Sequence, residues 1–443
     1  MRLSKKIQTV LLIIYFAVTP LWVSINPIVF HEVKLLIIYL CILFISFIAL
    51  FDYRHNKETY ISIKKTFKIE LKLVMIALVF MTISFFLNLE KLYALISSKE
   101  FGDGLWKGAG PNYLSFAFYI ISFLFIASSL TLVKTINFKL VSKSIVISLF
   151  IVGCLIIYQL FFYDFLGRGQ NYLFGWGNSN YTPEPYSIIG LLLLIPILFT
   201  KKVNYLHLGF GIFFFELVLL SSSRAAYFAL FLSISISMIV LLVKRRITIK
   251  KVLLLYGIAM LIVFVSYTVF NRFGFDSGIK ELTNLNSLSE NNTHDTFSLF
   301  SRLNLWGISL EYFADNFYSV LFGIGQNVFT YNTDSMHYLV SNAHNQYIEV
   351  LVSSGIVVFF IFILLLYRQF VYAVKLLNHN ISNIVLLTSL IFISVKWLFN
   401  SLNASHSPFV FLVFILISYR YYEMTNQNKN INIDEMKADY GHP

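Results

Sequence analysis

Apolar residues in this chain occur in long uninterrupted blocks, without the short alternating or one-faced patterns of a soluble domain. Blocks of roughly twenty apolar residues are long enough to cross a bilayer as helices. We therefore predict an all-α polytopic membrane protein with about twelve transmembrane helices. The predicted spans cover approximately residues 7–25, 33–51, 71–89, 113–132, 144–163, 186–200, 205–222, 225–243, 252–270, 345–366, 381–399 and 408–422.

The first apolar block resembles a signal peptide at first sight, because Arg2, Lys5 and Lys6 precede it. The block is longer than a typical signal sequence, contains Pro20 and lacks a small-residue cleavage site before the next block. We interpret it as an uncleaved first helix.

The loops between the predicted spans alternate in their content of lysine and arginine. Positive residues concentrate in cytoplasmic loops, so this alternation gives the orientation. It predicts that both termini are cytoplasmic and that the longest loop, 271–343 between spans nine and ten, is extracytoplasmic. We expect one polytopic membrane domain over 1–423 and a short disordered cytoplasmic tail over 424–443.

Composition supports a membrane protein and argues against other classes. Hydrophobic residues make up 58% of the chain and charged residues 13%, values that leave a soluble domain with large apolar patches. The net charge of +12 does not indicate nucleic-acid binding, because the basic residues lie between apolar blocks. Cys41 and Cys154 both lie inside apolar blocks and read as small hydrophobic residues.

Three places on the predicted outer face carry groups suited to an anion. In the first, one of three serines at 221–223 is expected to cap an outward-facing helix start, with Arg224 in its first turn. In the second, Arg302 begins an amphipathic helix, and Gly323 and Gly325 follow in a turn. The simpler alternative for each arginine is an interfacial residue that reaches lipid headgroups.

The third place is His344, expected in the first turn of the tenth span with Ser341 or Asn342 as its cap. A lone histidine at a membrane boundary is more often a hydrogen-bonded structural residue. Two arginines nearby would disfavour the imidazolium and keep a neutral base. Arginine forks and free helix N–H groups suit a diphosphate, and a neutral imidazole suits removal of a hydroxyl proton.

These residues resemble a known family, the O-antigen ligases and Wzy-type polymerases of bacterial envelope polysaccharides. The similarity covers about 210–366. It rests on Ser223–Arg224, the spacing of Arg302 and Trp306, the pair Gly323 and Gly325, His344–Asn345, and Gly355.

The resemblance implies a glycosyltransferase of the bacterial inner membrane that takes a glycan from undecaprenyl diphosphate, inverting the linkage and needing no metal or other cofactor. It implies that Arg224 and Arg302 hold the diphosphate and that His344 is the base. Asn345, Glu216 and Arg168 are possible supporting residues. The expected partners are the lipid-linked donor, a glycan or lipid A core acceptor, the bilayer and other polysaccharide-assembly proteins, with no nucleic acid.

Other charged residues carry weaker hypotheses. Glu216 and Lys396 lie within predicted spans, where ionisable residues are functional candidates, although they could also pair with each other. Asp103 and Glu184 could contact sugar or lipid phosphate in outer loops, although the simpler interpretation is that they are solvated loop residues. Glu349 lies five residues after His344 and is expected to face another side of the helix.

Two classes of function stay open. The first is transfer of a whole glycan, as a ligase, a polymerase or a protein-directed transferase. The second is a flippase for the same lipid-linked sugar, a transporter. The single long outer loop and the absence of an internal repeat favour the transferase.

Overall fold

The structure is a computed structural model. It describes residues 2–18, 57–88, 137–162, 183–199, 204–221, 223–272, 299–325, 331–333, 336–340, 343–400 and 407–439, together with positions 21, 40, 44 and 90.

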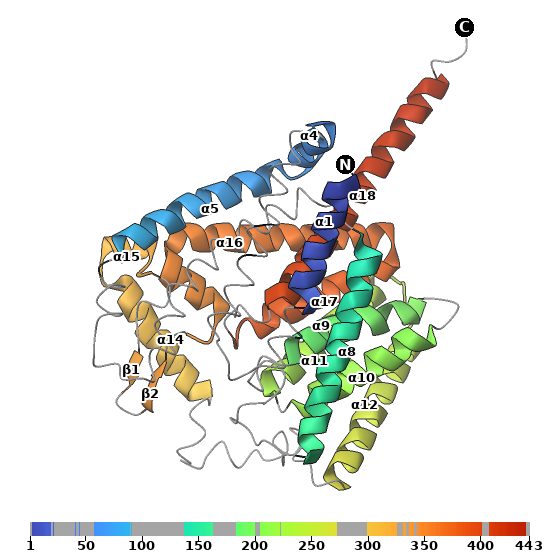
Figure 1. The fold of residues 1–443 in the computed structure, drawn as a ribbon, viewed down its shortest axis with the longest axis horizontal. Helices are drawn as coiled ribbons and strands as arrows, with labels where there is room; N and C mark the ends of the chain where they lie inside the picture. The colour runs from blue at the N-terminus through green and yellow to red at the C-terminus, as the bar shows by residue number, and fades with distance from the viewer. Residues whose placement is uncertain are drawn as a thin grey trace.

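Helices dominate these residues, as the apolar blocks predict (Figure 1). The α-helices are α1 (Arg2–Ile13), α4 (Lys57–Thr66), α5 (Lys68–Leu87), α8 (Phe138–Phe162), α9 (Pro183–Leu194), α10 (Tyr205–Leu220), α11 (Arg224–Val243), α12 (Ile249–Arg272), α14 (Leu299–Ala314), α15 (Phe317–Phe322), α16 (Gln346–His379), α17 (Ile384–Lys396) and α18 (Ser407–Asp439). Shorter helical turns are η1 (Ile14–Val18), η2 (Ile195–Phe199) and η4 (Ile381–Asn383).

Helices occupy the predicted spans wherever the structure describes them. Span 113–132, and span 33–51 except for positions 40 and 44, lie outside the described residues. Within the described part, four helices are long and apolar enough to cross a membrane: Lys68–Leu87, Phe138–Gln159, Arg224–Val243 and Gln346–His379. Shorter apolar helices include Pro183–Ile197, Tyr205–Leu220 and Ile381–Lys396. These helices and the composition agree with an integral membrane protein.

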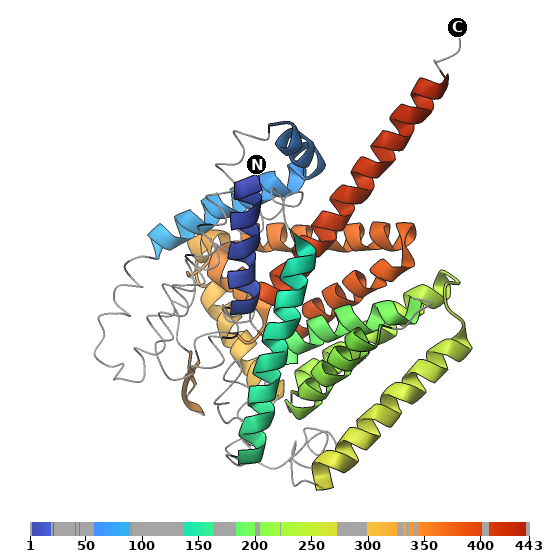
Figure 2. The ribbon, with the colours of Figure 1, turned by 45° about the vertical axis from the view of Figure 1, so that its right-hand side comes forward.

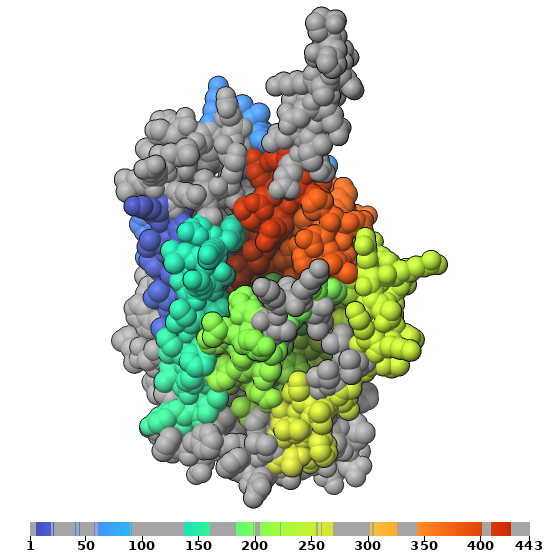
Figure 3. Space-filling view, turned by 90° about the vertical axis from the view of Figure 1, so that its right-hand side faces the viewer, coloured from blue at the N-terminus to red at the C-terminus, as the bar shows by residue number. Residues whose placement is uncertain are grey.

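The core forms where helices distant in sequence pack together. α16 crosses the molecule beside α5 and packs on α18, while α11 lies along α17 and α9 along α10 (Figures 1 and 2). Large buried side chains such as Tyr186, Phe214 and Phe392 fill this core. α8, α10 and α12 lie at the surface of the face that is turned by 90° from the view of Figure 1 (Figure 3). This arrangement fixes the start of α11 and the start of α16, which carry the candidate residues.

Helix α16 is broken at Gly355, where φ is +83°. Just before the break, the carbonyls of Val352 and Ser353 accept hydrogen bonds from the N–H groups of Ile324 and Gly325, at 2.9 and 3.2 Å. A Cβ on Gly355 would overlap the carbonyl of Leu321. The turn that the two predicted glycines allow therefore docks into the helix break, a role that their sequence does not reveal.

Two local features differ from the sequence expectations. The all-α prediction misses a short antiparallel hairpin, β1 (Tyr331–Thr333) and β2 (Met336–Val340), in which Tyr331 pairs with Val340. The tail expected to be disordered from 424 onward instead continues α18 to Asp439, which projects from the body (Figure 2). Polar residues can extend a helix once a packed apolar segment has nucleated it.

Candidate functional site

His344 lies just before α16 and not in its first turn as predicted. The helix begins at Gln346 with Asn345 as its cap, while Ser341 and Asn342 lie outside the described residues. The backbone of His344 has a φ of +48°. A left-handed conformation costs a non-glycine residue about 1–2 kcal/mol, so neighbouring contacts must hold it.

Asn345 is engaged at both ends of its amide. Its Oδ1 accepts the N–H groups of Tyr347 and Ile348 at 3.0 and 3.2 Å, and its Nδ2 donates to the Leu398 carbonyl at 3.2 Å. Its side chain therefore fixes the start of α16.

The N–H groups in the first turn of α16 are already used. Gln346 donates to the carbonyl of Trp397 at 2.9 Å, and Glu349 donates to that of Asn345 at 2.8 Å. Tyr347 and Ile348 donate to the cap. The expectation that free N–H groups of this helix help to bind a diphosphate is therefore wrong, because the protein itself satisfies them.

Trp306 and Arg302, four residues apart on α14, both act on the loop that carries His344. Its indole Nε1 donates to the carbonyl of Ala343 at 2.9 Å. Arg302 lies one turn earlier on the same face of α14, and its charge acts on His344. The pair thus reaches two consecutive residues of one loop.

One face of α14 packs against the body of the protein. Leu305 and Ser309 are buried, and Leu305 packs with Ile324 and Val352. Leu303 and Leu310 of the same helix are exposed, as an amphipathic helix that lies on the membrane surface would allow. Through this cluster α14 packs on the docked glycine turn and on α16.

Glu349 is a residue that the sequence interpretation wrongly set aside. Its carboxylate Oε2 accepts the N–H of Ala343 at 3.0 Å, and its side chain is buried. The peptide of Ala343 is therefore held on both sides, by Glu349 at its N–H and by Trp306 at its C=O. These two bonds fix the backbone immediately before the strained His344. The helical-face argument failed because the loop folds back over the helix start.

Burial and, to a smaller extent, the positive charge of Arg302 lower the pKa of His344 to about 4. The direction agrees with the expectation of a neutral imidazole, but burial contributes more than the arginine. His344 remains partly exposed, so a substrate can reach a neutral base at this position.

Arg224 is the first residue of α11, and Ser223 is its cap. The Ser223 hydroxyl accepts the N–H of Ala226 at 3.4 Å, as one of the three serines was predicted to do. One turn further on, the ring of Phe228 packs against that of Phe399, with 5.9 Å between the ring centroids. Phe399 follows Leu398, which binds the Asn345 side chain. Arg224 is partly exposed near the segment that supports the histidine loop.

The two intramembrane charges do not pair with each other. Glu216 of α10 accepts a hydrogen bond from the Ser266 hydroxyl of α12 at 2.7 Å. Lys396 instead forms an ion pair with Glu184 at 3.3 Å, with both side chains buried. The interpretation of Glu184 as a solvated loop residue is wrong, because it lies in the first turn of α9, where a carboxylate is favoured.

Several candidates cannot be placed. Arg168 and Asp103 lie outside the described residues. Within the described part of the chain, histidines, cysteines and carboxylates do not gather in groups of three or more that would suit a metal ion.

Fold and site together define an integral membrane protein with a neutral histidine and an adjacent arginine beside its helix starts. Residues 208–363 match the family model described as O-antigen ligase. The match confirms the resemblance to the O-antigen ligase and Wzy-type family, and it contains Arg224, Arg302 and His344. It supports an enzyme of lipid-linked glycan transfer in general. No curated protein matches this chain.

Proposed function

We propose that this chain transfers a glycan from undecaprenyl diphosphate to an acceptor hydroxyl at the outer face of the bacterial inner membrane. The observation that carries the proposal is the loop at Ala343–His344, clamped by Trp306 and Glu349 and placed in the field of Arg302. It presents a neutral nitrogen base beside a cation, within the segment that matches the O-antigen ligase family.

His344 takes the proton of the acceptor hydroxyl as that oxygen bonds to the anomeric carbon of the donor sugar. The bond from this carbon to the diphosphate oxygen breaks, and its electron pair leaves with the diphosphate. Attack from the face opposite the leaving group inverts the linkage.

Arg224 and Arg302 bind the diphosphate in this proposal and stabilise the charge that it gains on leaving. With two guanidinium groups, the reaction runs without a metal ion. Asn345 supports the base by fixing the start of α16, directly after His344. Glu216 supports the site through its hydrogen bond to Ser266 of α12.

The proposed topology places the site outside the membrane. Twelve spans form one domain over 1–423, both termini and the segment 424–443 are cytoplasmic, and loop 271–343 faces outward. Arg168 then lies on the same outer side as His344.

Reconstitution of the purified protein with a lipid-linked glycan tests the proposal. Separate reactions offer lipid A core, a second lipid-linked repeat unit and an acceptor protein. A ligase extends the first, a polymerase the second and a protein-directed transferase the third. A flippase moves the donor across the bilayer and forms no new glycosidic bond, which would refute the proposal. Retained activity in a chelator supports the metal-free step.

A further inference from the structure

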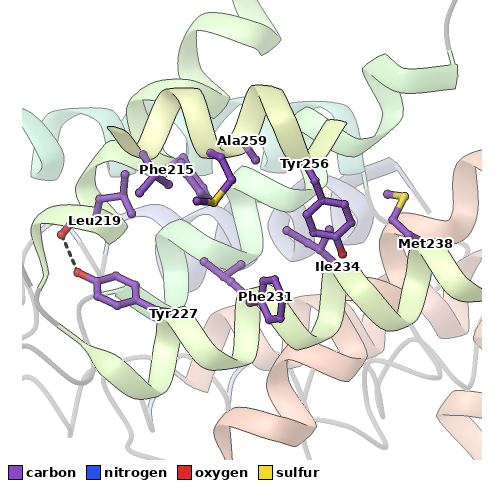
Figure 4. Close-up of a pocket in the computed structure, with 11 residues that line it drawn as sticks. Phe215, Leu219, Tyr227, Phe231, Ile234, Met238, Tyr256 and Ala259 are labelled. Carbon is purple, nitrogen blue, oxygen red and sulfur yellow. Dashed lines mark hydrogen bonds between the residues drawn. The ribbon is translucent and has the colours of Figure 1, made fainter. Parts of the chain in front are cut away.

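A pocket of about 250 Å³ lies between α10, α11 and α12, apart from the histidine loop (Figure 4). Its wall includes Phe215 from α10, Phe231 and Ile234 from α11, and Met260 from α12. Side chains of α11 and α12 point toward one another across this space (Figure 4). Apolar and aromatic groups form the wall.

The two tyrosines of this wall turn their polar ends to the protein. The hydroxyl of Tyr227 donates to the carbonyl of Leu219 at 2.6 Å, and that of Tyr256 donates to the Ser235 hydroxyl at 2.7 Å. Both phenol oxygens are therefore satisfied. The rings present their apolar faces, so the pocket suits a hydrocarbon.

The pocket begins one helical turn below Arg224. Tyr227 and Phe231 follow Arg224 by three and seven residues, so all three share one face of α11. Phe228 follows by four residues and contacts Phe399, next to the support of the histidine loop. Arg224 thus lies one helical turn from the pocket residue Tyr227 and one turn from Phe228, which packs beside the support of that loop.

We propose that this pocket holds the first isoprene units of the polyisoprenoid chain of the donor. The inference rests on the proposed function, because it takes Arg224 as a ligand of the donor diphosphate. A diphosphate at Arg224 then directs its sugar toward His344 and its lipid toward Tyr227 and Phe231. The lipid chain is uncharged, so the apolar wall of the pocket needs no charged side chain to hold it.

The pocket positions the donor rather than providing most of its affinity. A lipid chain leaving the bilayer for an apolar pocket gains little from burial, because lipid tails are as apolar as the pocket wall. Contact with fixed aromatic rings instead orders the chain near the diphosphate. The sugar then meets the base in one orientation, which lowers the entropic cost of reaction.

Kinetics with two donors test this role. Both donors carry the same glycan diphosphate, one on a full-length polyisoprenoid and the other on a two-unit chain. The short chain does not reach Ile234, which lies ten residues, or roughly 15 Å, along α11 from Arg224. Ile234→Trp fills the pocket from α11. Ile239→Trp is the matched control, because Ile239 lies on the exposed side of the same helix.

We expect Ile234→Trp to lower kcat/KM for the long donor roughly tenfold, the scale at which an apolar pocket discriminates, mainly through kcat because the pocket orders the donor for reaction. The kcat/KM for the short donor and the acceptor KM measured with either donor stay unchanged, as do all values for the control. Equal effects on both donors, or no effect, would overturn the pocket assignment. If the wild-type protein transfers from neither donor, the proposed function fails instead.

Photocrosslinking provides a measurement on the wild-type protein. A polyisoprenoid diphosphate with a photoreactive group in its second isoprene unit should label peptides of α11 and α12. Unlabelled polyisoprenoid diphosphate should remove this labelling, and excess dioleoylphosphatidylglycerol should not. Labelling elsewhere would overturn the pocket assignment. Equal competition by the phospholipid would overturn it as well, because membrane acyl chains would then occupy the pocket.

Discussion

The carboxylate of Glu349 accepts the backbone N–H of Ala343 at 3.0 Å, immediately before the proposed base. Trp306 holds the carbonyl of the same residue at 2.9 Å. His344 then follows in a left-handed conformation. Since strain of this kind persists only where surrounding contacts fix it, the two bonds give Glu349 and Trp306 a positioning role.

Glu349→Ala removes the acceptor of a buried N–H group, which costs about 1–3 kcal/mol. If the cost falls on the transfer step, kcat drops roughly tenfold or more. Glu349→Gln retains an oxygen acceptor and should recover most of the loss. Initial rates at saturating donor measure the effect. The exposed Glu311 of α14 provides the control variant Glu311→Ala. Equal rates for wild type and Glu349→Ala would remove Glu349 from the site.

The pH profile of kcat/KM should lack the limb of an ordinary histidine. Because the pKa of free His344 is lowered to about 4, the imidazole stays neutral from pH 8 down to about pH 5. Activity then falls only as the pH approaches 4. Arg302→Met removes the positive charge, which is the smaller of the two causes that lower this pKa. The acid limb should therefore move part of the way from about pH 4 toward the ordinary histidine value. A wild-type limb near 6.5 would contradict the assignment.

The break in α16 should not tolerate a side chain. In Gly355→Ala, the methyl group meets the Leu321 carbonyl, and φ stays positive. Gly323→Ala meets the backbone of Ser353 in the same way. Each change should destabilise the protein by about 2 kcal/mol or more, since strain and overlap add. Thermal denaturation in detergent measures this.

Gly307 gives a matched control for the glycine variants, because a Cβ there meets nothing within 4 Å. Gly307→Ala should leave the midpoint unchanged or raise it slightly, since alanine favours a helix. Similar midpoints for all three variants would refute the docking of the glycine turn into the break.

The buried pair Glu184–Lys396 should show strong coupling. Lys396→Met leaves a buried carboxylate without this cation, and loss of one partner in such a pair costs about 3–5 kcal/mol. Glu184→Gln should also destabilise the protein, because it leaves the buried lysine without this anion. The double variant should recover a large part of the loss, measured as thermal midpoints in a double-mutant cycle. Additive losses would contradict a direct pair.

Much of this architecture could be predicted from sequence because hydrophobic blocks and caps are local signals. The spans from α8 to α18 and the capping role of Ser223 needed no knowledge of distant contacts. The spacing of Arg302 and Trp306 also places them on one face of a helix. The residues with proposed chemistry can therefore be identified from local sequence signals alone.

The remaining features depend on contacts between distant segments. Glu184 meets Lys396 across two hundred residues, and the glycine turn enters α16 at Gly355. Periodicity carries no information about such pairings. The left-handed backbone of His344 was also hidden, because the bonds to Glu349 and Trp306 impose it against the preference of the residue.

The most direct test of the central claim is glycan transfer by reconstituted His344→Ala protein with a purified lipid-linked donor and its acceptor. We predict that wild-type protein forms a new glycosidic bond and that His344→Ala forms none, with unchanged protein level and thermal midpoint. His207→Ala, which changes an exposed histidine of α10, should retain full activity. Undiminished transfer by His344→Ala would contradict the account.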